Sequence, residues 1–280
     1  ISYFINYQYV NEYYKMIKKI KLFTSNTDYS NVILEELCKK LEKYGYIISD
    51  DDYDLAIAIG GDGTFLKMVK ECNFSSNVYY LGINTGTLGF TGEIYPSDID
   101  MFLDNLKINA YKTENISIQE TKVHANNITS HFYSLNEIVI RDKNLNTAHL
   151  DIKINSDLLE RFVGDGVLIS TSLGSTAYNL SFKGSIVYSD LHTLQITPIA
   201  PLNSKSYRTL QNSVIIPEKR IIKIIPAIRT KDLIVTIDGE NNIYDNVQMI
   251  ETSVKKRKIK CLRMKEYDYT KKVYEKFAKD

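Results

Sequence analysis

The chain has 280 residues, of which 44% are hydrophobic and 25% are charged, close to the average of folded globular domains. This composition excludes a disordered chain, a collagen-like chain and a coiled coil. Lys and Arg (35) nearly balance Asp and Glu (34), so the net charge of +1 provides no long-range attraction to nucleic acid or to anionic lipid. We therefore expect neither a nucleic-acid partner nor a membrane partner.

Cysteine use and the apolar pattern predict a cytoplasmic protein. The three cysteines are widely spaced and lie outside any Cys/His cluster, so neither a disulfide framework nor a structural zinc site is expected. No apolar run approaches the roughly 18 residues needed to span a membrane. Residues 1–15 precede the first strand-like segment, and we interpret them as a possible appendage outside the fold.

The first part of the chain, residues 16–112, alternates helical and strand patterns. Apolar residues recur at helical spacing between residues 31 and 44, and the continuous apolar run at 55–59 is typical of a parallel strand that is covered on both faces. A second amphipathic helix begins near Phe65, and another short strand follows at 78–83. This alternation predicts a doubly wound α/β domain.

The pattern changes over residues 113–261. Short runs rich in β-branched residues are separated by Asn, Asp, Gly, Ser and Pro, which predicts a β-rich, sandwich-like domain. The last stretch, residues 267–280, has apolar side chains near one face at helical spacing. We expect this C-terminal helix to return to the first domain, so residues 262–280 are assigned there.

The sharpest local signal is a glycine-rich loop between the strand at 55–59 and the following helix. In Gly60–Thr64, Gly61 and Gly63 flank Asp62, and such glycines bring the backbone close to a ligand at the carboxyl end of a parallel strand. A carboxylate repels phosphate, so Asp62 should serve a hydroxyl or a metal. The alternative is that Asp62 only caps the helix, and the local pattern does not decide between the two.

Two common nucleotide signatures are missing from the sequence. No G-x-x-x-x-G-K-[ST] motif occurs, which excludes a P-loop. The segment 61–66 starts like the dinucleotide fingerprint G-x-G-x-x-G but ends in leucine, where that fingerprint needs glycine for close helix packing. A hydride-transferring Rossmann enzyme is therefore disfavoured.

Three further segments carry polar or aromatic residues in unusual places. A second glycine cluster, residues 82–92, contains Phe90, which either stacks on a ligand ring or is a core aromatic. Asn136 and Glu137 interrupt an apolar strand and need partners, which a diol or ribose would supply, unless they form a surface β-bulge. The hydroxyl-rich segment 170–181 can donate to phosphate and amide oxygens, or it is a plain loop.

Taken in order, Gly60–Thr64, Asn84–Phe90, Asn136–Glu137, Gly164–Gly166 and Gly174–Ser181 resemble the NAD kinase family. The resemblance implies an N-terminal α/β domain, a C-terminal β-rich domain with a returning C-terminal helix, and a homodimer or homotetramer. It implies NAD and ATP as substrates, NADP as product, and Mg²⁺ carried by the nucleotide phosphates, with no metal ligand assigned to the protein. The alternatives are a lipid or small-alcohol kinase of the same superfamily, or a non-catalytic dinucleotide-binding sensor.

The resemblance also implies roles for individual residues. Asp62 resembles the proton acceptor for the adenosine 2′-hydroxyl, and Asn136 and Glu137 resemble the pair that holds the ribose. Phe90 resembles the aromatic beside the adenine, and Asp165 the aspartate that contacts the nicotinamide part. The other residues that the resemblance places at the dinucleotide are His149, Thr176, Ala177, Tyr178, Asn179, Leu180, Ser181 and Ala200.

Overall fold

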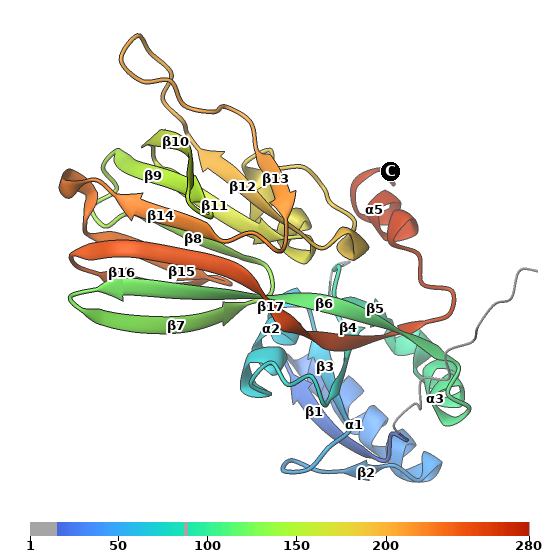
Figure 1. Cartoon of the computed structure of the whole chain (residues 1–280). Coiled ribbons are helices and arrows are strands. Elements are labelled where there is room, and N and C mark those ends of the chain that lie inside the picture. Colours follow the sequence, from blue (N-terminus) through green and yellow to red (C-terminus); the bar gives the residue numbers. More distant parts are fainter. Residues whose placement is uncertain (1–15, 87–88, 280) are drawn as a thin grey trace, which may run out of the picture.

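The computed structural model describes residues 16–86 and 89–279, and its N-terminal part alternates strands and helices as the sequence predicts (Figure 1). Its elements are β1 (Lys19–Thr24), α1 (Asp28–Tyr44), β2 (Ile47–Ile48), β3 (Leu55–Gly60), α2 (Asp62–Glu71), β4 (Tyr79–Asn84), β5 (Gly92–Ile94), η1 (Pro96–Asp98) and α3 (Ile99–Lys107). The strands pair in parallel in the order β5-β4-β3-β1-β2. The predicted appendage, residues 1–15, lies outside the described residues.

Strand β3 explains why helices cover both faces of this sheet. Its alternate residues Leu55, Ile57 and Ile59 pack with α1 and α3, while Ala56 and Ala58 pack with α2. Since successive side chains of a strand point to opposite faces, one run of apolar residues builds both cores. The bulky residues face two helices, and the alanines face one.

The second part of the chain consists mainly of strands. They are β6 (Tyr111–Ala125), β7 (Ile128–Ser134), β8 (Glu137–Asp142), β9 (Ala148–Ile154), β10 (Asp157–Gly164), β11 (Gly166–Thr171), β12 (Thr193–Ile199), β13 (Val214–Pro217), β14 (Ile222–Pro226), β15 (Leu233–Ile237), β16 (Glu240–Tyr244) and β17 (Val247–Met264). Short helical segments are η2 (Leu173–Thr176), α4 (Tyr178–Ser181), η3 (Ser189–Leu191) and η4 (Ile228–Thr230).

Two sheets pack face to face in this second part. One is a six-stranded antiparallel sheet in the order β13-β12-β11-β8-β15-β16. The other is formed by β10, β9, β14, β17, β6 and β7. A single apolar cluster with members from both sheets fills the space between them. The predicted β-sandwich-like domain is confirmed, and with it the α/β plus β fold class.

The two parts share one continuous sheet. The end of β17 pairs in parallel with β4 through Lys260 and Cys261, while its start pairs antiparallel with β14. Strand β6 pairs with β17 along almost its full length (Figure 1). The strands of the first part and the β10-β9-β14-β17-β6-β7 sheet therefore form one sheet, which has 11 strands among the described residues. The domain boundaries that the sequence predicts, after residues 112 and 261, fall inside β6 and β17.

The chain ends in the predicted C-terminal helix, α5 (Tyr269–Phe277). The Asp268 carboxylate caps it by accepting the N–H of Thr270 at 2.7 Å. The helix returns to the first part, where Lys272 donates hydrogen bonds to the backbone oxygens of Gly89 and Gly92. No helix within the described residues is long and apolar enough to cross a membrane.

Candidate active site

Asp62 is the first residue of α2, and Gly61 occupies the N-cap position before it. The Asp62 carboxylate forms its hydrogen bonds with the segment after β4. Oδ2 accepts the N–H of Phe90 at 3.1 Å, and Oδ1 accepts the N–H and the hydroxyl of Thr91 at 3.0 and 2.5 Å. The start of α2 has no side-chain cap among the described residues. Asp62 is therefore not a helix cap, and it links the two glycine-rich loops that the sequence singles out.

The glycines around Asp62 have two different uses. A Cβ at Gly89 would lie 2.3 Å from Asp62 Oδ1, so only glycine lets this backbone approach the carboxylate. At Gly61 and Gly63, a Cβ would meet no described atom within 4 Å. These two predicted substrate-binding positions therefore leave open space in front of the loop.

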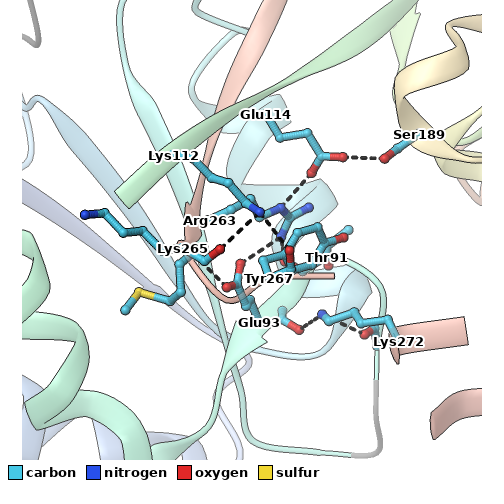
Figure 2. Close-up of polar contacts among 12 residues, drawn as sticks. Thr91, Glu93, Lys112, Glu114, Ser189, Arg263, Lys265, Tyr267 and Lys272 are labelled. Carbon is cyan, nitrogen blue, oxygen red and sulfur yellow. Dashed lines mark hydrogen bonds and ion pairs between the residues drawn. The ribbon is translucent and has the colours of Figure 1, made fainter. Parts of the chain in front are cut away.

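The segment 89–92 is held from its other side by two buried cations (Figure 2). Lys272 donates to the Gly89 oxygen at 3.2 Å and also to the Gly92 oxygen, and Arg263 Nη1 donates to the Thr91 oxygen at 3.1 Å. Burial, together with the nearby Arg263, lowers the pKa of Lys272 to about 8. The loop thus lies between a carboxylate that accepts its N–H groups and cations that bind its carbonyl groups.

Carboxylates balance these cations. Arg263 Nε donates to Glu114 Oε2 at 2.6 Å, and Glu93 lies 3.8 Å from Arg263 Nη1. Ser189 donates to the second oxygen of Glu114 (Figure 2). Because buried charges are tolerated only when they are paired, this cluster fixes the end of β17 against β5 and β6.

Phe90 is a core aromatic in this structure. Its ring is 6% exposed and packs against Tyr269 and Phe277 of α5, with ring centroids 5.9 and 5.6 Å apart. Of the two interpretations of Phe90, the packing contact is therefore present, and the contact with adenine remains a prediction. The ring ties the loop to the same helix that carries Lys272.

Asn136 and Glu137 lie where the chain crosses from β7 in one sheet to β8 in the other. Their backbone N–H groups both donate to Asp238 Oδ1, at 2.8 and 3.2 Å, and Leu135 donates to Asp238 Oδ2 at 2.8 Å. Glu137 is 7% exposed. The pair thus forms a crossover held by one aspartate, with Glu137 buried and Asn136 half-buried, and the surface-bulge interpretation does not fit Glu137.

The Glu137 carboxyl has an unusually high pKa. Burial and the neighbouring Asp238 raise its pKa to about 8. Burial also raises the pKa of Asp238, although the three N–H groups that it accepts favour its charged form. Glu137 Oε2 is buried and has no hydrogen-bond partner among the residues that the structure describes. A buried oxygen without a partner is suited to a ligand hydroxyl.

The hydroxyl-rich segment packs directly on Asn136. A Cβ at Gly174 would lie 2.0 Å from the Asn136 backbone oxygen, so glycine is required for this contact. Within the segment, Asn179 is fully buried. Its Nδ2 donates to the Ser175 oxygen at 3.1 Å, and its Oδ1 accepts the Thr197 hydroxyl at 2.6 Å. Asn179 is accordingly an internal brace of the segment.

The remaining predicted residues of this segment are closer to the surface. Tyr178 is exposed, and its hydroxyl accepts a hydrogen bond from Arg141 at 3.2 Å. The Thr176 hydroxyl donates to the Leu173 oxygen at 3.3 Å. Ala177 and Leu180 are half-buried, and Ser181 is exposed.

Asp165 and Ala200 are brought together at the ends of β10 and β12. The N–H of Asp165 donates to the Ile199 oxygen at 2.9 Å, and Ala200 has a φ of 43°. His149 is engaged elsewhere, because its Nδ1 lies 2.8 Å from Arg229 and its ring packs edge-on against Tyr207. Burial and Arg229 lower the pKa of His149. The structure thus places Asp165 next to Ala200. The side chain of His149 contacts Arg229 and Tyr207 instead.

A cavity of about 900 Å³ lies between α2 and the strands of the second part. Gly63 lines it from the Asp62 loop, and Asp238 lines it from the Glu137 side. Lys67, Lys70 and Arg257 contribute positive charge to its wall, and Glu240, which pairs with Lys70, contributes negative charge. The cavity thus reaches the neighbours of Asp62 and Glu137, but Asp62, Asn136 and Glu137 themselves are not part of its lining.

Sequence reasoning missed Asp238 and Lys272 as members of this site. Asp238 had a signal, since Asp238-Gly239 is a two-residue hairpin turn between β15 and β16 with φ values of 43° and 88°. That signal predicts the turn but does not show that the carboxylate reaches the backbone of Asn136. Lys272 had none, because a lysine in a terminal amphipathic helix is expected to face water.

Comparison with known proteins decides the family. Residues 10–111 match the family described as ATP-NAD kinase N-terminal domain, and residues 135–263 match the ATP-NAD kinase C-terminal domain. The chain belongs to the NAD kinase family. The NAD kinase of Finegoldia magna is 40% identical over 219 residues, covering 75% of this chain and 80% of that protein. The NAD kinase of Streptococcus pneumoniae is 36% identical over 246 residues, covering 86% and 89%.

Solved structures show that this member of the NAD kinase family has the family fold. A yeast NADH kinase complexed with NADH aligns with a TM-score of 0.83 at 21% identity, covering 95% of this chain and 90% of that one. An NAD kinase from Archaeoglobus fulgidus in complex with ATP aligns with a TM-score of 0.69 at 19% identity, covering 89% and 94%. The resemblance that the sequence motifs indicate is confirmed.

Proposed function

We propose that the chain transfers the terminal phosphoryl group of ATP to the adenosine 2′-hydroxyl of NAD, giving NADP and ADP. The new bond joins the 2′-oxygen to phosphorus, the bond from that phosphorus to the leaving ADP breaks, and the hydroxyl proton goes to Asp62. Membership of the NAD kinase family supports this reaction. The observation that carries it in the site is the buried Glu137 oxygen without a partner, next to Asn136 and suited to a ribose hydroxyl.

The proposed role of Asp62 fits its surroundings. A carboxylate offers about four lone-pair positions, and the three hydrogen bonds from Phe90 and Thr91 leave capacity for one more partner. These bonds also hold the side chain in one orientation. In a loose phosphoryl-transfer transition state, alignment contributes more than base strength, so a fixed acceptor suits the reaction.

The acceptor side of the site would hold the dinucleotide. We assign the ribose to Asn136 and Glu137, and the adenine to the neighbourhood of Phe90. Asp165 and Ala200 lie together and would contact the rest of the dinucleotide with the exposed Tyr178. Because Asn179 is fully buried, we assign it the role of bracing this segment.

The donor side would use the open space at Gly61 and Gly63 and the N-terminus of α2, where free N–H groups attract phosphate. Lys67 and Arg257 on the cavity wall would neutralise further charge. Among residues 16–86 and 89–279, no three His, Cys, Asp or Glu side chains gather as a metal site. We propose that Mg²⁺ arrives with ATP on its phosphates, where it would neutralise the charge of the donor.

We further propose that the protein is cytoplasmic and forms a homodimer or homotetramer. Three free cysteines support a reducing compartment. The oligomeric state follows from the family resemblance alone, and light scattering on the purified protein would measure it.

An assay of NADP formation that crosses NAD and NADH with ATP and polyphosphate tests the proposed function. We expect phosphorylation of at least one dinucleotide with ATP and Mg²⁺, measured with an NADP-specific dehydrogenase. A folded protein that binds NAD by calorimetry but forms no phosphorylated product from any combination would instead be a dinucleotide sensor.

A further inference from the structure

One peptide group connects a buried lysine to Asp62. The oxygen of the Gly89–Phe90 peptide accepts a hydrogen bond from Lys272 Nζ at 3.2 Å. The N–H of the same peptide donates to Asp62 Oδ2 at 3.1 Å. A cation therefore binds one end of this amide dipole, and a carboxylate binds the other end.

Such an arrangement strengthens both hydrogen bonds. A cation at the oxygen polarises the amide and makes its N–H a better donor, and the carboxylate acts in the same sense from the other side. Lys272 is 8% exposed, and burial reduces the screening of these interactions by water. The position of Asp62 is accordingly coupled to the ammonium group.

Lys272 also holds the segment as a whole. It donates to Gly92 as well as to Gly89, while Arg263 binds the Thr91 oxygen between them. The carbonyl groups of this irregular segment thus point to cations from the C-terminal end of the chain (Figure 2). The N–H groups of Phe90 and Thr91 point to Asp62.

Helix α5 gives Lys272 a fixed place. Tyr269 and Phe277 of the same helix pack on the Phe90 ring, so the helix contacts the segment through apolar and ionic groups at once. Tyr269 also donates to the Val187 oxygen at 3.2 Å, in the second part of the chain. The neighbouring Lys271 is largely exposed and lies 4.0 Å from Glu275.

We propose that Lys272 is a positioning residue for phosphoryl transfer, acting on Asp62 through the Gly89–Phe90 peptide. This inference rests on the proposed function, in which Asp62 is the proton acceptor. Loss of the ammonium group would release the 89–92 segment and let the carboxylate turn away from the ribose hydroxyl. The released segment also carries Phe90, which we place near the adenine, so NAD binding would weaken as well, but less than turnover, because the hydrogen bonds of Lys272 are to the loop and not to the other residues assigned to the dinucleotide.

The test compares Lys272→Met with Lys271→Met, which removes a charge from the exposed side of the same helix. For Lys272→Met we expect kcat to fall at least about tenfold and KM for NAD to rise by a smaller factor, because a misplacement of 1 Å at the reacting groups can cost roughly 100-fold in rate. Lys272→Arg should recover most of kcat, since it restores a cation with several donors. Lys271→Met should behave like the wild-type protein.

A double-mutant cycle shows whether the effect passes through Asp62. In the Asp62→Asn background, Lys272→Met should cost little further activity. A full additional loss would mean that Lys272 acts elsewhere, and an unchanged kcat in Lys272→Met would overturn the proposal. If Lys272→Met does not fold, Lys272→Gln, which keeps a donor without the charge, replaces it in both comparisons.

Hydrogen exchange separates this inference from the proposed function. The amides of Phe90 and Thr91 should exchange faster in Lys272→Met than in Lys271→Met, whatever reaction the protein catalyses. Unchanged exchange at these two amides would refute the positioning role. Faster exchange in a protein that forms no NADP would leave the loop-holding role of Lys272 standing and refute the proposed function alone.

Discussion

Replacing Asp62 by Asn separates its chemical role from its structural one. Asn keeps one oxygen, which can still accept the N–H and the hydroxyl of Thr91. Its amide nitrogen would face the N–H of Phe90, where the structure has an acceptor. That N–H loses its partner inside the protein, at a cost of about 1 to 3 kcal/mol in the free energy of unfolding.

The two expected effects of Asp62→Asn differ greatly in size. At about 2 to 4 °C per kcal/mol for chains of this size, Tm should fall by only several degrees. The amide cannot accept the hydroxyl proton, so kcat should fall by about 10² to 10⁴. NADP formation at saturating ATP and NAD measures kcat, and calorimetry measures Tm.

Thr91→Val is the matched control, because it removes one hydrogen bond to the carboxylate and leaves the proton acceptor in place. Its Tm should fall by a similar amount, while its kcat should fall far less than that of Asp62→Asn. Equal losses of activity in the two variants would show that Asp62 serves only to anchor the loop. Full turnover by Asp62→Asn would refute the proton-acceptor role.

Further substitutions test other parts of the site. Because the pKa of Glu137 is raised from 4.5 to about 8 in the fold, the folded chain binds more protons than the unfolded chain between these values, and stability falls as pH rises through this window. Glu137→Gln should therefore reduce the drop in Tm between pH 6 and pH 8. Gly174→Ala would place a Cβ 2.0 Å from the Asn136 oxygen, so NAD affinity measured by calorimetry should weaken by about 1 to 3 kcal/mol while the protein stays folded. Arg263→Met would leave the half-buried Glu114 without its cation, and chemical denaturation should show a loss of about 3 kcal/mol.

Local patterns in the sequence were sufficient to predict the fold class. The apolar run of β3 and the helical spacing of α1 depend on residues close together in the chain, so periodicity shows them directly. The shared 11-stranded sheet was not predictable in the same way. It depends on pairing between Lys260 and Tyr79, which are far apart in the sequence, and no local rule sets such a register.

In the candidate site too, local motifs reveal some residues, and contacts between distant parts of the chain hide others. Residues in glycine-rich or polar motifs, such as Asp62 and Glu137, stand out because their types are unusual beside buried strands. Lys272 does not stand out, since its importance arises from burial against a loop about 180 residues earlier in the chain. The hydrogen bonds from Phe90 and Thr91 to Asp62 were also hidden, because backbone donors leave no mark in side-chain patterns.

The long strands β6 and β17 restrict how the enzyme can move during its reaction cycle. Many kinases close over their substrates by rotating two lobes about a flexible hinge. Here two neighbouring, hydrogen-bonded strands run from one lobe into the other, and their register is irregular between Val254 and Lys258. A large rotation would have to be absorbed at this irregularity, or else bend or break the ladder on either side of it. Where the ladder holds, adjustments to ATP and NAD are left to the loops that border the cleft, and little binding energy is consumed in drawing the lobes together.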